Sequence, residues 1–238
     1  MVQEWLGTDD AAGRQQGTKL IRGEKILPVA GTEFWSPGRV RVDGIERDSI
    51  ETGDLSLTSR RDGEEHAAVA RGLVARSTWG TLSTISRHLH GSPFGNVVSF
   101  TDGIPGNYSG TPYFYLTPLD PSAADVAADP HASLAISAMP LGACGDSDPE
   151  SPLCAKLTLS GELRQVLDAQ ELSFAEHALF TRHPEMTIWP KDHHFRVFKL
   201  VLASVFFING FGGPRHITVE QYYSASPVNL SRSFLHEA

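Results

Sequence analysis

The sequence has few cysteines, no excess of positive charge and no long apolar run, and each shortage excludes a class of protein. Its 238 residues include 2 cysteines, which can form one bridge but not a disulfide framework. The formal net charge is -8, so the basic footprint of a duplex-binding protein is missing and we expect no nucleic-acid partner. No run approaches the roughly 18 apolar residues that a membrane helix needs, so we expect no membrane span.

Short motifs of common enzyme sites are also missing. The chain has no nucleophile elbow, Walker loop, dinucleotide fingerprint or HExxH pair. The glycine pair in Phe211–Pro214 does not match a phosphate loop and predicts a tight turn. The amino end shows no basic start followed by an apolar core, so no signal peptide is visible, although a trimmed chain would look the same.

Charge density divides the chain near His66. Residues 1–66 hold 9 Lys or Arg and 13 Asp or Glu, about twice the density of the remainder. We interpret residues 1–63 as a charged, mostly disordered extension, residues 64–223 as the folded domain and residues 224–238 as a tail. The alternative for the first segment is a small subdomain built around Phe34 and Trp35.

Alternating and β-branched patterns predict a mainly β (α+β) fold. The six predicted strands are residues 78–86, 96–100, 112–116, 134–138, 155–165, with a bulge at Gly161, and 195–208. Predicted helices are residues 64–76, 124–130 and 169–181, the last capped by Asp168. Most connections are too short for parallel crossovers, so we expect an antiparallel, closed or nearly closed β-barrel with peripheral helices.

Cys144 and Cys154 enclose an acidic, polar loop. A bridge between them would stabilise the fold by roughly 3 kcal/mol on the chain-entropy model. The alternative is a pair of free thiols in a cytosolic interaction protein. Neither cysteine has a second cysteine or a histidine at metal spacing, so no zinc site is predicted.

Two sequons mark candidate N-glycosylation sites at Asn107 and Asn229. His183, His193 and His194 are candidate metal ligands only by proximity in sequence. Pro184 interrupts any helix that could align them, so we interpret them as residues of a polar turn and predict no metal.

Several segments resemble, in order, the CREG family of secreted cellular-repressor glycoproteins: WGTLSTIS, PFGNVVSFTDG, GTPYFYLTPL, SPLCAKLTLSG, HALFTRHPEMTIWP and FGGPRHITVEQYY. The resemblance implies an antiparallel split β-barrel of the FMN-binding type, related to pyridoxamine-phosphate oxidases. It implies a homodimer with an occluded flavin pocket, no cofactor and no enzyme activity.

The same resemblance implies a glycoprotein that is secreted or lysosomal and acts in growth and differentiation. Some family members engage the mannose-6-phosphate/IGF-II receptor through their glycans. Cys144 and Cys154 fall where the family has paired cysteines, which supports the bridge, and Asn229 lies near a C-terminal sequon of relatives.

The alternative function is an FMN-dependent oxidoreductase in which Ser99 and Thr117 flank the flavin phosphate. Such a site needs a cationic anchor, and Arg87 is the nearest basic residue in the strand-forming segments before residue 156. A dimer partner could supply Arg164 or Lys199. The shortage of anchors favours the non-enzymatic interpretation.

The last predicted strand, FRVFKLVLASVFFI, carries more apolar area than one barrel wall can bury. Surplus apolar surface is often covered by a second subunit. We therefore expect a two-fold dimer on this argument as well.

Overall fold

A computed structural model describes residues 52–228 of the chain. The strands are β1 (Trp79–Ile85), β2 (Pro93–Ser99), β3 (Thr101–Ile104), β4 (Asn107–Leu116), β5 (His131–Ser137), β6 (Lys156–Gln165), β7 (Arg196–Ile208) and β8 (Arg215–Ile217). The helices are α1 (Thr52–Arg76), α2 (Pro121–Val126), α3 (Ala169–Arg182) and α4 (Val219–Ser224), with short 3-10 turns η1 (Met139–Leu141), η2 (Pro184–Ile188) and η3 (Lys191–His193).

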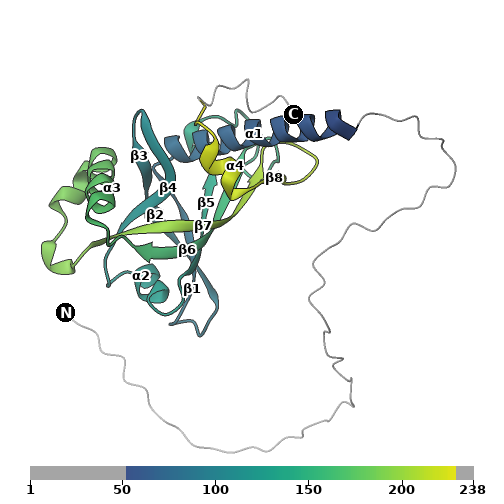
Figure 1. The fold of residues 1–238 in the computed structure, drawn as a ribbon. Coiled ribbons are helices and arrows are strands. Elements are labelled where there is room, and N and C mark those ends of the chain that lie inside the picture. The colour runs from purple at the N-terminus through teal and green to yellow at the C-terminus, as the bar shows by residue number, and fades with distance from the viewer. Residues whose placement is uncertain (1–51, 229–238) are drawn as a thin grey trace, which may run out of the picture. The chain divides into compact units, whose positions relative to one another are not determined.

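One antiparallel sheet forms the body of the protein (Figure 1), in the strand order β2-β1-β5-β6-β7-β4-β3, with β8 pairing with β7. β2 and β3 lie at opposite edges of this order, yet only Phe100 separates them in the chain. The sheet must therefore curl until its two edges meet, which produces the split barrel. This confirms the expected fold class.

The structure confirms all six predicted strands and adds two short ones, β3 and β8. The dipeptide Asp102-Gly103 is typical of a turn, but Thr101–Ile104 pairs with β4, with an irregular register between Thr101 and Gly103. Strands of three or four residues are too short to show a period-2 pattern, so their formation depends on a neighbouring strand edge.

The predicted bulge at Gly161 is confirmed, and the extra residue lies on the partner strand. Ser160 pairs with Ser204 and Gly161 with Leu202, which leaves one β7 residue unpaired. A Cβ atom at Gly161 would lie 1.9 Å from the carbonyl oxygen of Val201, so the close approach of β6 and β7 requires glycine.

Helix α1 begins at Thr52, whereas we predicted a start at residue 64. The apolar stripe that we used, with Ala67, Ala70 and Leu73, is buried in the barrel core. Once this packed portion is helical, extension toward the amino end adds one hydrogen bond per residue and needs no apolar pattern. The helix therefore continues into the predicted extension.

The other two predicted helices are present. Helix α3 is capped as predicted, because the Asp168 carboxylate accepts hydrogen bonds from the backbone N–H groups of Gln170 and Glu171. Helix α2 starts at Pro121, three residues before the predicted start at residue 124, because Asp120 caps it and proline suits a first helical turn.

Two clusters of buried side chains hold the fold together. The larger cluster fills the barrel and includes Leu73 of α1, Leu134 of β5 and Phe207 of β7. The smaller cluster joins α3 to the outer side of β4 and β7, around Leu179 and Val197. Helix α3 and the segment after it are thereby fixed beside the end of β4.

Cys144 and Cys154 form a disulfide, and both residues are buried. The bond closes the polar loop between η1 and β6. The alternative with two free thiols therefore does not describe this structure.

The described region runs from residue 52 to residue 228. None of its helices combines the length and apolar content required to span a bilayer. The predicted boundaries at residues 63 and 223 stay predictions, and residues 1–51 and 229–238 lie outside the described residues.

Candidate functional site

Ser99 and Thr117 lie on the same cavity, as the flavin alternative required. Ser99 ends β2 and Thr117 follows β4, and the closure of the sheet at Phe100 brings these two strands together. The cavity has a volume of about 410 Å³. Its lining residues are Val97, Val98, Ser99, Tyr115, Leu116, Thr117, Asp120, Met186, Trp189, Pro190 and Phe195.

Aromatic rings form one wall of this cavity. Tyr115 stacks on Phe195, with ring centroids 5.0 Å apart, and on Trp189 at 6.1 Å. The Thr117 hydroxyl donates a hydrogen bond of 2.5 Å to the carbonyl oxygen of His193. This bond holds the segment between α3 and β7 against the cavity. Because the Thr117 hydroxyl donates its proton to His193, it has no second proton to donate to a ligand.

A carboxylate, that of Asp120, lines the cavity in which the flavin alternative would place a phosphate. Asp120 accepts a hydrogen bond of 2.7 Å from the backbone N–H of Ser122 and one of 3.0 Å from the Asn96 side-chain amide. These donors, the backbone N–H of Ser122 in α2 and the side-chain amide of Asn96 in β2, are groups that could otherwise bind an anion. Because Asp120 is the only charged lining residue and is negative, the residues of this cavity do not fit a phosphate.

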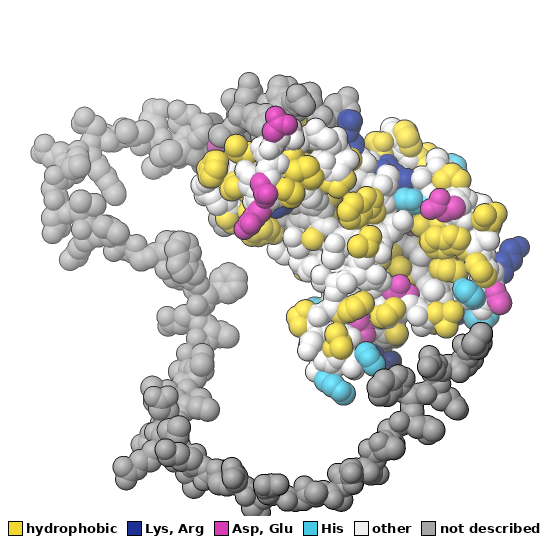
Figure 2. Space-filling view, turned by 180° about the vertical axis from the view of Figure 1, so that it is seen from behind, with side chains coloured by type: hydrophobic (Ala, Val, Ile, Leu, Met, Phe, Trp, Pro, Cys, Tyr) yellow, Lys and Arg dark blue, Asp and Glu magenta, His cyan; other side chains and the backbone are white. Residues whose placement is uncertain are grey.

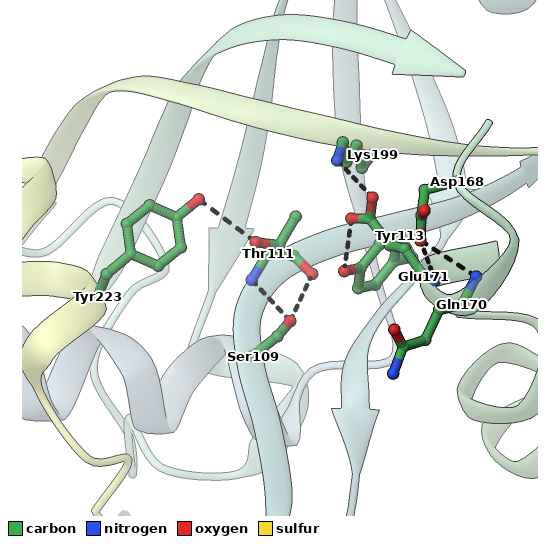
Figure 3. A network of polar contacts seen from close by, with 8 residues as sticks. All are labelled: Ser109, Thr111, Tyr113, Asp168, Gln170, Glu171, Lys199 and Tyr223. Carbon is green, nitrogen blue, oxygen red and sulfur yellow. Dashed lines mark hydrogen bonds and ion pairs between the residues drawn. The ribbon is translucent and has the colours of Figure 1, made fainter. Parts of the chain in front are cut away.

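Lys199, one of the predicted cationic anchors, is already paired within its own chain (Figure 3). Its Nζ atom lies 2.6 Å from Glu171 Oε2, and Tyr113 donates a 3.1 Å hydrogen bond to the other carboxylate oxygen. Burial, followed by the Glu171 charge, raises the pKa of Tyr113. The other two candidate anchors, Arg87 and Arg164, line a different cavity.

Sequence reasoning missed the Asn96–Asp120 pair. The two residues are 24 positions apart, and neither belongs to a recognisable motif. The Asp120-Pro121 dipeptide was the available signal, because an Asp before Pro commonly caps a helix and directs its carboxylate at the first turn.

Comparison with known families agrees with the geometry. A sequence model described as CREG, beta-barrel matches residues 61–224. The chain belongs to the CREG family. It is 41% identical to human Protein CREG1 over 195 residues, which cover 80% of this chain and 87% of that protein. It is 38% identical to mouse Protein CREG2 over 166 residues, which cover 68% of this chain and 57% of that protein.

Solved structures share the fold of this CREG chain. A heme binding protein from Mycobacterium smegmatis aligns with a TM-score of 0.56 and 25% identity, covering 68% of this chain and 61% of that one. A protein of unknown function from Agrobacterium tumefaciens aligns with a TM-score of 0.52 and 19% identity, covering 75% and 64%. The CREG domain is thus a split barrel of the FMN-binding type.

The three candidate histidines do not converge on one point. His183 is buried, and its Nε2 atom lies 3.0 Å from the carbonyl oxygen of Phe100, whereas His194 is exposed. Across residues 52–228, we find no group of three or more His, Cys, Asp or Glu side chains that could hold a metal ion.

Asn107, the first candidate glycosylation site, is the exposed first residue of β4, where it pairs with Ile104 of β3. The hydroxyl of Ser109, the third residue of this sequon, donates a 2.8 Å hydrogen bond to the carbonyl oxygen of Asp102. The side chain that would carry the glycan thus faces solvent, and the sequon is anchored by its serine. Asn229 lies outside the described residues.

A buried pair of opposite charges joins α1 to the β3–β4 hairpin of the CREG barrel. Arg71 donates a 2.9 Å hydrogen bond to the carbonyl oxygen of Tyr108 and lies over the Tyr222 ring, 5.4 Å from its centroid. Asp102 is fully buried and accepts a 3.3 Å hydrogen bond from the Gly110 N–H, while its Oδ1 atom has no hydrogen-bond partner.

Burial raises the pKa of Asp102 to about 6, although the positive charges of Arg71 and Arg182 oppose the shift. The folded protein therefore binds a proton near pH 6, whereas the unfolded carboxyl remains ionised down to about pH 4. Protonation of Asp102 therefore increases the free energy of unfolding as the pH falls through 6. This contribution is lost as the pH rises above 6.

Replacing Asp102 with Asn should remove this pH dependence while preserving the side-chain shape. In the native protein, Asp102 should add about 2 kcal/mol to the free energy of unfolding on going from about pH 7.5 to about pH 4.5. Urea unfolding at both pH values measures the difference, and the Asp102→Asn protein should lack that increment. Asp146→Asn, in an exposed loop, serves as the control. An unchanged pH dependence in Asp102→Asn contradicts the assignment.

Proposed function

We propose that this CREG protein is a non-enzymatic, secreted or lysosomal glycoprotein. It acts as a homodimer in growth and differentiation control by binding a receptor or another partner. The observation that carries the non-enzymatic part is the Asp120 carboxylate, which takes up the hydrogen-bond donors Asn96 and Ser122. A flavin phosphate would meet negative charge there instead of a cation.

A flavin titration tests the absence of cofactor binding. We expect no saturable quenching of FMN fluorescence by the purified protein at about 100 µM, because phosphate binding requires charge-assisted donors. Thr117→Val is the matched variant, since it removes the hydroxyl that the flavin alternative assigns to the phosphate. Quenching that saturates in the native protein and is lost in Thr117→Val would establish the FMN-dependent alternative.

N-linked glycosylation at Asn107 is the second part of the proposal. It is supported by the exposure of Asn107 at the start of β4, which leaves the side chain accessible to a glycan, and by the disulfide, which is typical of chains that pass through an oxidising compartment. The mannose-6-phosphate/IGF-II receptor is the proposed partner for such glycans, and Asn229 is the second proposed attachment site.

A glycopeptide map of protein recovered from culture medium tests this part. We expect a glycan on the Asn107 peptide, and Asn107→Gln should lower the mass of the secreted protein by one glycan. Gln165→Asn is the control, because it introduces an asparagine without creating a sequon and should leave the mass of the glycans unchanged. Asn96→Gln is unsuitable because it would remove the hydrogen bond between Asn96 and Asp120. An unmodified Asn107 in secreted protein would refute the assignment.

The homodimer is supported by an outer sheet face whose side chains are uncharged and, except for Phe206, small. Ser83, Ser133, Ser160 and Ser204 are successive cross-strand neighbours on β1, β5, β6 and β7. The next row is Thr81, Ala135, Thr158 and Phe206. We name these two rows the small-residue face.

Large apolar side chains accompany the small-residue face. Trp79, Val201 and Phe206 are each 46% exposed. Figure 2 shows hydrophobic side chains over much of one side of the molecule, with acidic, basic and histidine side chains among them. The two rows of the small-residue face contain no charged side chain, so covering them costs little hydration energy, and this supports burial against a second copy.

Sedimentation of a face variant tests the dimer. The native protein should sediment with the mass of two chains, and Ser204→Arg should weaken association at least about tenfold, because a two-fold interface receives each added charge twice. Thr187→Arg, an exposed position on η2, is the charge-matched control. A single-chain mass for the native protein, or an unaffected Ser204→Arg dimer, argues against this interface.

A further inference from the structure

A second cavity, with a volume of about 500 Å³, is lined by residues of α2. Figure 1 shows this helix at one end of the barrel. This cavity shares only Leu116 with the cavity of Ser99 and Thr117. Its inner surface is apolar: Leu116, Ala123, Val126 and Leu163 are buried. The alanines of α2 are too short to fill the space, so the cavity remains open.

The charged side chains around this apolar surface are all positive. Arg87, Arg164 and Arg196 line the cavity, and none of its lining residues is acidic. They come from three separate segments: the loop after β1, the end of β6 and the start of β7. In a chain with a net charge of -8, three guanidinium groups at one cavity mark a local reversal of charge.

Two of these guanidinium groups are free to bind. Within residues 52–228, the side chains of Arg87 and Arg196 make no hydrogen bond or ion pair, and each is exposed. Arg164 bonds to Glu162 at 2.6 Å, but both side chains are about half exposed, so this pair is weak.

The carboxylates near α2 are engaged elsewhere. Asp125 is buried, and it accepts 2.9 Å hydrogen bonds from the Thr84 hydroxyl and from the backbone N–H of Arg87. This second bond fixes the backbone of Arg87 at the edge of the cavity. Asp129 bonds to His131 at 2.6 Å. Neither acid therefore lines the cavity, and Asp125 helps to hold Arg87 in place beside it.

We propose that this cavity binds a small amphipathic organic anion, with the apolar body against α2 and a carboxylate or phosphate head between Arg87 and Arg196. Guanidinium groups bind both head groups through paired, charge-assisted hydrogen bonds. The apolar interior adds the hydrophobic contribution of the ligand body. This site is independent of the proposed function, because it neither uses the Asp120 region nor requires a dimer.

Isothermal titration calorimetry with short single-chain amphiphiles tests the proposal. Decanoate and decyl phosphate should each bind with one ligand per chain at low ionic strength, and their relative affinities identify the preferred head group. Decyltrimethylammonium and the neutral octyl glucoside should bind at least about tenfold more weakly, because the rim is cationic.

Substitutions locate the binding site. Arg87→Ala and Arg196→Ala should each weaken decanoate binding about tenfold, the usual effect of losing a hydrogen bond to a charged group. Ala124→Phe should weaken it by filling the cavity. Lys191→Ala removes the same charge outside this cavity and should leave the affinity unchanged.

Three results would overturn the proposal. One is the absence of saturable binding of either anion up to about 1 mM, since useful affinities for such ligands lie below this level. Another is equal binding of the cation and the anions, which would indicate an apolar cavity that does not select charge. The third is anion binding that persists unchanged in the Arg87→Ala/Arg196→Ala protein, in which case the arginines only shield the apolar surface.

Discussion

Phe100 connects the two edges of the sheet, and the geometry of both cavities follows from that connection. It is fully buried and packs against Phe114, its N–H donates to the carbonyl oxygen of Thr78, and its own carbonyl oxygen faces His183. Because β2 and β3 follow one another through this single residue, the sheet has to close. Closure places the end of β2 beside the end of β4 and leaves α2 to cover the adjoining end of the barrel.

The two cavities of this CREG chain differ in charge. The cavity lined by Ser99 and Thr117 has hydroxyl groups and an aromatic wall that a cofactor site could use, and its charged lining residue is the carboxylate of Asp120. Positive charge gathers instead at the second cavity, at Arg87, Arg164 and Arg196. The charged lining residue of the first cavity is acidic, whereas those of the second are basic.

Low pH favours the folded state of this protein through the buried carboxyl group of Asp102. Asp102 is buried among α1 and the β3–β4 hairpin with one oxygen unpartnered, and protonation relieves the cost of burying its charge. Arg71 bonds only to backbone carbonyl oxygens, so its charge is dispersed and not neutralised by a direct contact. The disulfide between Cys144 and Cys154 does not titrate, so it adds no pH dependence of its own.

The sequence by itself determined the six longer strands, the cap at Asp168, the bulge opposite Gly161 and, through its ordered segments, the CREG family. These are local signals: a period of two, a capping residue and a glycine that no side chain can replace. Only the tertiary structure decided that Thr101–Ile104 is a strand, that Asn96 bonds to Asp120, and that three arginines share one cavity. Each of these depends on segments brought together by barrel closure, and contacts between residues far apart in the chain leave no periodic trace in the sequence.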